Sequence, residues 1–449
     1  MSRRLIHRAV IHRHGDRTPI TAVGSASFWE RTLPTSSALS ALAQAFPVRR
    51  GGRTTSAPGQ GRLARDQDAG LSAHPAGGVP PYGQLTAVGV DQLTKLGWDL
   101  RQSLSNAGAP RLDADRIRCF ATPFSRTIMS AQALLTGLLR VETSRLGAHP
   151  SSELRQRAIR RVPCQVDTSI GELLLPDPEP RHWRQLELEA AHWADPAVLD
   201  EEAAVADLAA RACEGLVRGG VVESVEALGR ADGNGVSWNR LAEISKCYAV
   251  HGGGGGDENA STNILPLADV DEICGVAARR WFALFRKREV ARYAIGGLLS
   301  KMLRGATESL DRAESRPPSR TLAPALHLYS AHDSTLIALI CALQLRHSDG
   351  RVVDHWPAYA SDLQLSLYGG DGEEPVFVAT LDGEEMILDG TACRAATRDN
   401  ALISQPFDAY GDGGVLAYPV DSVVADAADV LAAESRDVEA IDAEEGRWW

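Results

Sequence analysis

The chain has 449 residues, of which 44% are hydrophobic and 23% charged, and its formal net charge is −11. This length can bury a large core and predicts one large domain or two unequal ones. The negative charge disfavours a general nucleic-acid binder, because binding a phosphate backbone needs a broad basic surface. We also expect no transmembrane segment, since no apolar run is long enough to cross a bilayer.

The beginning of the chain, MSRRLIHRAVIH, lacks the uninterrupted apolar stretch of a secretory signal. We therefore expect a cytoplasmic or other intracellular protein, or a lysosomal or secreted one if the N-terminus is incomplete. The seven cysteines show neither CxxC nor zinc-like spacing. They indicate no complete disulfide framework and no metal knuckle, although one or two bridges stay open.

The highest concentration of ionisable side chains that could act in catalysis lies close to the N-terminus, in AVIHRHGDRTP, Ala9 to Pro19. Its apolar run predicts the end of a buried strand, and Gly15 with Pro19 predicts a turn. Two histidines, two arginines and an aspartate follow the strand. Because open α/β sheets bind ligands beyond the carboxyl ends of their strands, we predict the active-site loop here.

The next segments alternate between irregular and regular patterns. Residues 24–83 contain many glycines and prolines, and we expect an irregular surface excursion. Residues 84–104 place apolar side chains on one helical face. Residues 116–122 predict a strand, and the apolar helix after it carries Arg126 at its start, where anions are favoured.

Residues 163–287 are rich in Ala, Glu, Arg and Trp and predict a helical cap or insertion, in which 251–256 form a flexible connector. The acidic tail beyond Asp421 predicts a solvated helix or a frayed end. The remaining expected elements are a helix over 288–304, a buried strand around 326–329, a buried helix over 334–345, and sheet-edge strands over 362–368 and 376–381.

The loop after the first strand supports two chemistries. His12, His14 and Asp16 form the HxHxD spacing with which some binuclear hydrolases bind metals. Against a metal, Arg13 and Arg17 would hold two fixed cations close to a dication, which is electrostatically costly. The alternative is phosphoryl transfer, in which a neutral His14 attacks phosphorus and the arginines neutralise the phosphate oxygens bidentately. The residues favour phosphoryl transfer over metal binding, because the flanking cations favour the neutral, nucleophilic form of His14.

The segment RHGDRTP, Arg13 to Pro19, resembles the signature of histidine acid phosphatases, a branch of the histidine phosphatase superfamily. TPFSRTIMSAQALLTGL, which contains Arg126, is similar to the second arginine segment of the family, and YSAHDSTLIALICAL is similar to its distal HD segment. Softer matches extend the resemblance from about residue 5 to residue 381. The chain departs from the family at Phe120, Ala121 and Ser366, where the family usually has arginine, serine and glutamate.

The resemblance implies a role for each matching residue. His14 would be the covalent nucleophile and Asp333 the general acid, whose pKa a bound phosphate dianion should raise. Asp16 would support the turn. The phosphate would be held by Arg13, Arg17, Arg126 and His332, so that no metal or other cofactor is needed.

We predict an α/β fold with a mostly parallel central sheet flanked by helices. The expected domains are a phosphatase core (1–162 and 288–395), a largely helical cap (163–287) and an acidic C-terminal extension (396–449). The expected function is an acid phosphatase acting on small phosphate monoesters through a phosphohistidine. The alternatives are a phytase-like or lysophosphatidic-acid phosphatase activity on the same pocket, or a catalytically silent protein that binds a phosphorylated ligand.

Overall fold

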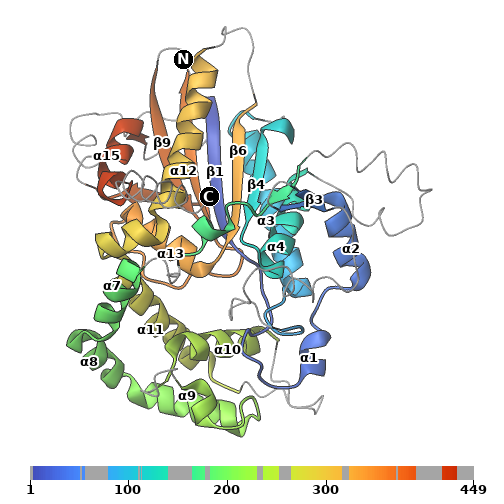
Figure 1. Cartoon of the computed structure of the whole chain (residues 1–449), viewed down its shortest axis with the longest axis vertical. Helices are drawn as coiled ribbons and strands as arrows, with labels where there is room; N and C mark the ends of the chain where they lie inside the picture. Colours follow the sequence, from blue (N-terminus) through green and yellow to red (C-terminus); the bar gives the residue numbers. More distant parts are fainter. Residues whose placement is uncertain are drawn as a thin grey trace, which may run out of the picture.

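The computed structural model describes residues 4–50, 53–55, 79–109, 112, 114–139, 164–176, 183–229, 236–251, 264–315, 323–370, 373–390 and 417–431. They form a mixed sheet with helices on both faces and a further group of helices below the sheet (Figure 1). The α/β fold predicted from the sequence is confirmed. No helix in these ranges is long and apolar enough to cross a membrane.

The sheet is organised around β1 (Arg4–Arg13), which joins a parallel half to an antiparallel half. The other strands are β2 Val48–Arg50, β3 Arg53–Thr55, β4 Ile117–Ala121, β5 Val166–Asp167, β6 Ala325–Ala331, β7 Leu345–His347, β8 Asp362–Gly370, β9 Glu373–Leu381, β10 Glu384–Leu388 and β11 Tyr418–Pro419. Their order is β3-β2-β5-β4-β6-β1-β8-β9-β10-β7, with β11 beside β9. Because β2, β5, β4, β6 and β1 are parallel, their carboxyl ends meet at one edge.

Helices bury both faces of this sheet. On one face α3 (Ala87–Asn106) and α4 (Ser125–Leu139) share a core with Val10 of β1. The core on the other face surrounds Ile11. Its helices are α12 (Arg288–Glu314), α13 (Asp333–Ala342) and α15 (Val420–Leu431). β1 is thus buried on both sides, and its ends have no freedom to move independently of the core.

Two glycines bring helices close to their neighbours near the carboxyl edge. A Cβ on Gly97 of α3 would lie 2.0 Å from the Leu134 carbonyl oxygen of α4, so only glycine allows this helix contact. A Cβ on Gly89 would lie 2.3 Å from the Asp16 carbonyl oxygen. The first turn of α3 therefore lies directly against the loop that follows β1.

A separate helical region lies beyond the carboxyl edge, at the lower end of Figure 1. It has its own buried core, to which Trp29 and Trp238 contribute. Its helices are α7 Trp183–Trp193, α8 Pro196–Ala204, α9 Ala206–Arg218, α10 Trp238–His251 and α11 Leu267–Phe285. These helices are the elements available to close a cavity over the ends of the parallel strands.

Several local expectations are wrong. Residues 24–83 are not irregular throughout, because the chain forms α1 (Ala26–Glu30), α2 (Ser36–Ala45), β2 and β3 before residues 56–78, which lie outside the described ranges. β8 and β9 are not edge strands, since each has strands on both sides. The expected flexible connector begins with His251, which is the last residue of α10, whereas 252–256 lie outside the described ranges.

The start of the acidic tail is also different from the prediction. α15 is not a solvated helix, because it packs against α12 and buries a stripe of small apolar residues. A Cβ on Gly296 of α12 would lie 2.5 Å from the Val430 carbonyl oxygen, which shows how close the two helices are. The buried side chains of α15 are Val420, Val423, Ala427 and Val430.

Candidate active site

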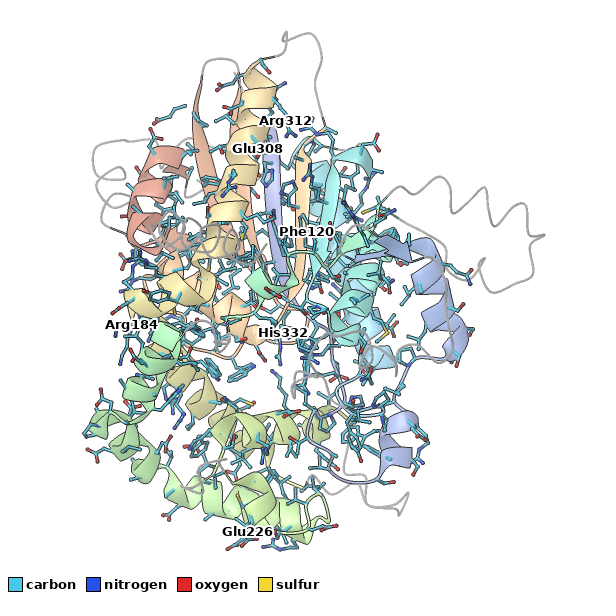
Figure 2. The ribbon with its side chains drawn as sticks, in the orientation of Figure 1. Phe120, Arg184, Glu226, Glu308, Arg312 and His332 are labelled. Atoms are coloured by element: carbon cyan, nitrogen blue, oxygen red, sulfur yellow. The ribbon has the colours of Figure 1, made fainter. Side chains whose placement is uncertain are left out.

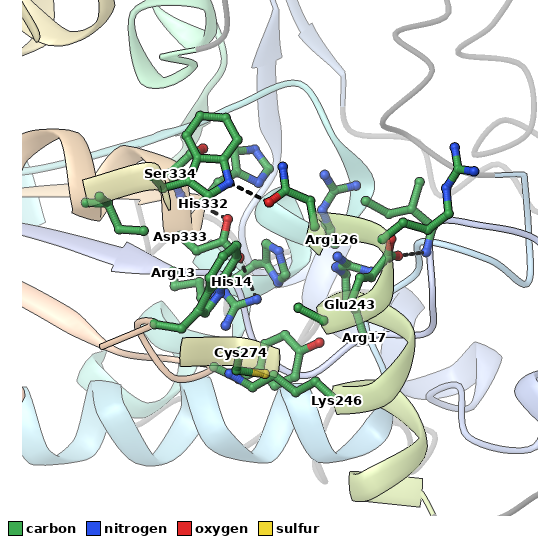
Figure 3. A pocket seen from close by; sticks show the side chains of 18 of the residues that line it. Arg13, His14, Arg17, Arg126, Glu243, Lys246, Cys274, His332, Asp333 and Ser334 are labelled. Atoms are coloured by element: carbon green, nitrogen blue, oxygen red, sulfur yellow. Dashed lines mark hydrogen bonds and ion pairs between the residues drawn. The ribbon is translucent and has the colours of Figure 1, made fainter. Parts of the chain in front are cut away.

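Three neighbouring parallel strands deliver the predicted residues to one place. Arg13 ends β1 opposite Ala331 of β6, and Ala121 of β4 lies opposite Ser330. The residues after these strands therefore converge, and Figure 3 shows their side chains facing one cavity of about 370 Å³. Figure 2 places His332 in the interior, far from the peripheral Arg184 and Glu226. All six predicted site residues line the cavity: Arg13, His14, Arg17, Arg126, His332 and Asp333.

His14 is buried with one ring nitrogen engaged. Its Nδ1 lies 2.8 Å from the carbonyl oxygen of Gly15. Because a carbonyl only accepts, Nδ1 carries the proton and Nε2 of the neutral ring keeps its lone pair. Burial, followed by the charges of Arg126 and Arg13, holds the pKa of His14 well below its usual value. The lowered pKa favours the neutral ring, with the lone pair of Nε2 directed away from the Gly15 carbonyl.

Arg13, Arg17 and Arg126 place three positive charges close together in the protein interior. Arg13 forms an ion pair with Asp333 (2.7 Å), and Arg17 forms one with Glu243 (2.8 Å). Burial and the nearby Arg17 lower the pKa of Arg126 to about 9. These three guanidinium groups thus have two carboxylate partners, and an anion in the cavity would reduce the repulsion among the guanidinium groups.

Asp333 and His332 begin α13 directly after β6. The Asp333 carboxylate accepts hydrogen bonds from Arg13 and, at 3.0 Å, from the Trp356 indole. Burial raises the pKa of Asp333, but the charges of Arg13 and His332 outweigh it and lower the pKa to about 2. His332 Nε2 lies 3.1 Å from the Thr122 hydroxyl, and burial with Arg126 keeps the pKa of His332 well below its usual value. Asp333 is therefore a carboxylate that is paired with Arg13.

Sequence reasoning missed the residues that close the cavity from the other side. Glu243 and Lys246 come from α10, and Cys274 comes from α11. Trp356 and Tyr359 precede β8, and the Arg13 guanidinium lies 4.2 Å from the centre of the Tyr359 ring. None of these residues has a local motif that marks it. Only the fold brings them to the strand ends.

His12 and Asp16, which the metal interpretation would use, lie outside the cavity lining. The Nδ1 of His12 hydrogen-bonds to the Arg13 carbonyl (3.1 Å), and burial lowers the pKa of His12 to about 4. Asp16 accepts hydrogen bonds from Thr86 and His251. In the described ranges no three His, Cys, Asp or Glu side chains group as metal ligands would. All six cysteines described are free.

Residues 4–189 match the family model of the histidine phosphatase superfamily, branch 2. The resemblance to this superfamily is confirmed. The match contains His14 and Arg126 but not His332 or Asp333, which lie further along the chain. The match supports phosphatase activity. No curated protein matches the chain.

Solved structures extend the similarity of fold to most of the chain. A Hafnia alvei phytase in complex with tartrate is 14% identical with a TM-score of 0.54, and covers 96% of this chain and 98% of its own. A Klebsiella phytase is 14% identical with a TM-score of 0.53, covering 95% and 96%. A Bifidobacterium longum multiple inositol polyphosphate phosphatase with phosphate is 12% identical with a TM-score of 0.51, covering 95% and 93%. At these identities the similarity concerns the fold alone.

Proposed function

We propose that the protein is an acid phosphatase that hydrolyses phosphate monoesters through a phosphohistidine on His14. The observation that carries the proposal is the buried, neutral imidazole of His14, whose Nδ1 is held by a carbonyl while three arginines line the same cavity. A neutral nucleophile surrounded by fixed cations suits attack on a phosphate, because the cations neutralise the oxygens that would otherwise repel it.

In the first step, Arg13, Arg17, Arg126 and His332 bind the non-bridging oxygens of the ester. Nε2 of His14 attacks phosphorus, and the bond between phosphorus and the ester oxygen breaks. The departing oxygen takes a proton from Asp333 and leaves as an alcohol. In the second step Asp333, now a carboxylate, accepts a proton from water as the water attacks the phosphohistidine and releases phosphate.

Asp333 needs a proton in the first step, although its pKa is about 2 in the empty pocket. Among the groups that lower this pKa, Arg13 has the largest effect. A phosphate dianion bound between the arginines opposes that field and favours the protonated carboxyl. The bound substrate thus favours protonation of Asp333, and an acidic solution favours it further. For this reason we propose an acid phosphatase.

A phytase-like activity is the second candidate. Arg240 and Lys246 of α10 line the cavity beyond the phosphate-binding residues. They add positive charge where the remainder of a substrate would lie. A substrate that carries several phosphates, such as an inositol polyphosphate, would be favoured there over a neutral alcohol.

The test is turnover of para-nitrophenyl phosphate by the wild type and by His14→Ala, with and without a chelator. We expect the wild type to be active and insensitive to the chelator, and His14→Ala to be inactive although folded. Activity that survives in His14→Ala removes His14 as the nucleophile, and activity lost to the chelator revives a metal mechanism. A folded wild type that binds phosphate without turnover would be a silent phospho-ligand-binding protein.

A further inference from the structure

One face of α10 contacts the loop that follows β1. Glu243, Cys247 and His251 are spaced by four residues, so they lie on the same side of the helix. Glu243 accepts hydrogen bonds from the Arg17 guanidinium and the Ile20 amide. The Cys247 thiol donates to the Arg17 carbonyl at 3.3 Å. The helix therefore holds both the side chain and the backbone of a predicted phosphate ligand.

The third contact of this face joins His251 to Asp16. His251 Nε2 lies 2.6 Å from Asp16 Oδ2, and because a carboxylate only accepts, Nε2 is the donor. The Thr86 hydroxyl donates to the same oxygen at 2.5 Å. Asp16 has no exposed surface. Among the described residues Asp16 Oδ1 has no hydrogen-bond partner, so the two donors to Oδ2 are the side-chain stabilisation of this buried carboxylate, and losing one of them is costly.

The backbone of Asp16 is fixed by hydrogen bonds to the first turns of α3. Its amide donates to the Gln92 side chain at 2.8 Å, and its carbonyl accepts from the Thr86 amide at 3.0 Å. Both partners lie at the beginning of α3. Asp16 thus connects α3 to the end of α10, and it stands between the nucleophile His14 and the phosphate ligand Arg17.

We propose that the hydrogen bond between His251 and Asp16 is a positioning contact that fixes Arg17 for phosphate binding. Neither residue lines the cavity, so the pair acts through Arg17, the neighbour of Asp16. Without the His251 donor the Asp16 carboxylate must turn or take up water, which displaces the adjoining backbone. Displacements of about 1 Å at such a ligand are costly in binding and in rate.

The inference rests on the proposed function, and its test uses three variants. His251→Ala removes the donor, His251→Gln supplies an amide N–H in its place, and Ser245→Ala is a control on the same helix. Ser245 lies beside Leu216 of α9 and Tyr248, away from the loop. The measurements are the Kd of inorganic phosphate by calorimetry and the kcat and KM for para-nitrophenyl phosphate.

We expect His251→Ala to raise the Kd for phosphate and the KM about tenfold, the effect of losing one hydrogen bond to a charged group. His251→Gln should recover most of this loss, and Ser245→Ala should resemble the wild type. Wild-type phosphate affinity in folded His251→Ala overturns the inference, as does an equal loss in the Ala and Gln variants. If His251→Ala does not fold, His251→Leu replaces it, because leucine also lacks a donor but fills more of the buried space, and wild-type affinity in that variant also overturns the inference.

The calorimetry separates this inference from the proposed function. A wild type that binds phosphate but turns over no ester contradicts the proposed function. The comparison of phosphate Kd values among the variants still decides whether His251 and Asp16 position Arg17.

Discussion

The two ends of the cavity are built in different ways. At the phosphate end, the residues follow β1, β4 and β6 and are fixed by a sheet that is buried on both faces. At the other end, Lys246 and Cys274 come from α10 and α11, which pack in a second core, although the end of α11 also joins the core of the sheet. We propose from this difference that the residues at the strand ends carry out the chemistry, whereas the helical region selects the substrates.

The two ends are not independent of each other. Arg17 belongs to the phosphate end, yet its ion-pair partner Glu243 belongs to α10. The same helix carries Arg240 and Lys246, which also line the cavity and which we propose to contact the remainder of the substrate. If the division between chemistry and selectivity is correct, substitutions at the phosphate end should affect every substrate, and those at the helical end should affect only some.

The largest effect is expected at Asp333, in a manner that depends on the leaving group. Asp333→Asn removes the proton donor, so hydrolysis of glycerol phosphate should slow by about 10²- to 10⁴-fold. Para-nitrophenolate departs without a proton, and its release should slow by less than about tenfold. The measurement is kcat/KM for both substrates with one preparation of the variant, because kcat also contains the second step, in which Asp333 would act as a base for either ester. Equal losses for the two esters would contradict the general-acid role.

Arg126→Ala should lower kcat/KM by about 10²- to 10³-fold for every phosphate ester, because it removes a charged donor to the transition state. The variant should not be less stable than the wild type, since burial and Arg17 oppose the charge of Arg126 and lower its pKa to about 9. Kinetics with several esters, together with thermal melts, test both statements. Arg126→Lys is the matched control, which keeps a charge but loses the planar fork.

A loss of activity confined to large or highly charged esters would place Arg126 at the selective end instead. The division into a phosphate end and a substrate-selecting end would then be wrong, because a residue on the strand side of the cavity would determine substrate selectivity.

The contrast also explains what the sequence could predict. His14 and His332 stand directly after β1 and β6, and Arg126 lies in the first turn of α4, the helix that follows β4. Neighbouring parallel strands bring such positions together without further information. A motif of a few residues was therefore sufficient for the phosphate end. The contact between Arg17 and Glu243 spans 226 positions, and nothing near Glu243 in the sequence marks it.

Composition was misleading for two segments. The acidic residues of α15 suggested a solvated helix, but Val423 and Val430 are buried against the core. His251 precedes a run of glycines, and this neighbourhood concealed that its ring closes a buried hydrogen bond to Asp16. In both segments a tertiary contact outweighed the structure that the local composition favours, as such contacts commonly do. For α15 this contact is its packing against the core, and for His251 it is the hydrogen bond to Asp16.

Buried histidines of the sheet should limit stability in acid. Burial lowers the pKa of His7 to about 3 and those of His12 and His327 to about 4. Below pH about 6.5 the unfolded chain binds protons at these positions while the folded chain does not. The free energy of unfolding is therefore expected to fall with decreasing pH, by about 1.4 kcal/mol per pH unit for each histidine.

Urea melts of the wild type and of His327→Gln between pH 7 and pH 4.5 test this expectation. The variant should show a shallower dependence on pH, by about one proton. An unchanged slope would mean that His327 does not remain neutral in the folded protein. An acidic working pH is compatible with this loss of stability as long as the folded state remains favoured at that pH.

The smallest effect is expected from Lys246→Met, at the helical end. Lys246 Nζ lies 5.1 Å from the centre of the Tyr359 ring, and burial followed by Arg13 lowers its pKa to about 8. The substitution should raise KM for a substrate with a second phosphate by about threefold to tenfold, the size of one solvent-screened charge contact. KM for para-nitrophenyl phosphate, which has no second charge, should change by less than about twofold.

The pH dependence of the wild type makes this last prediction sharper. Lys246 loses its charge as the pH rises through about 8, so the preference for the doubly phosphorylated substrate should decline there and approach that of Lys246→Met. Preference is measured as the ratio of kcat/KM for the two substrates, which cancels any titration they share at the phosphate end. A ratio that is the same in both proteins at pH 6 would mean that the selective charge lies elsewhere, for example at Arg240.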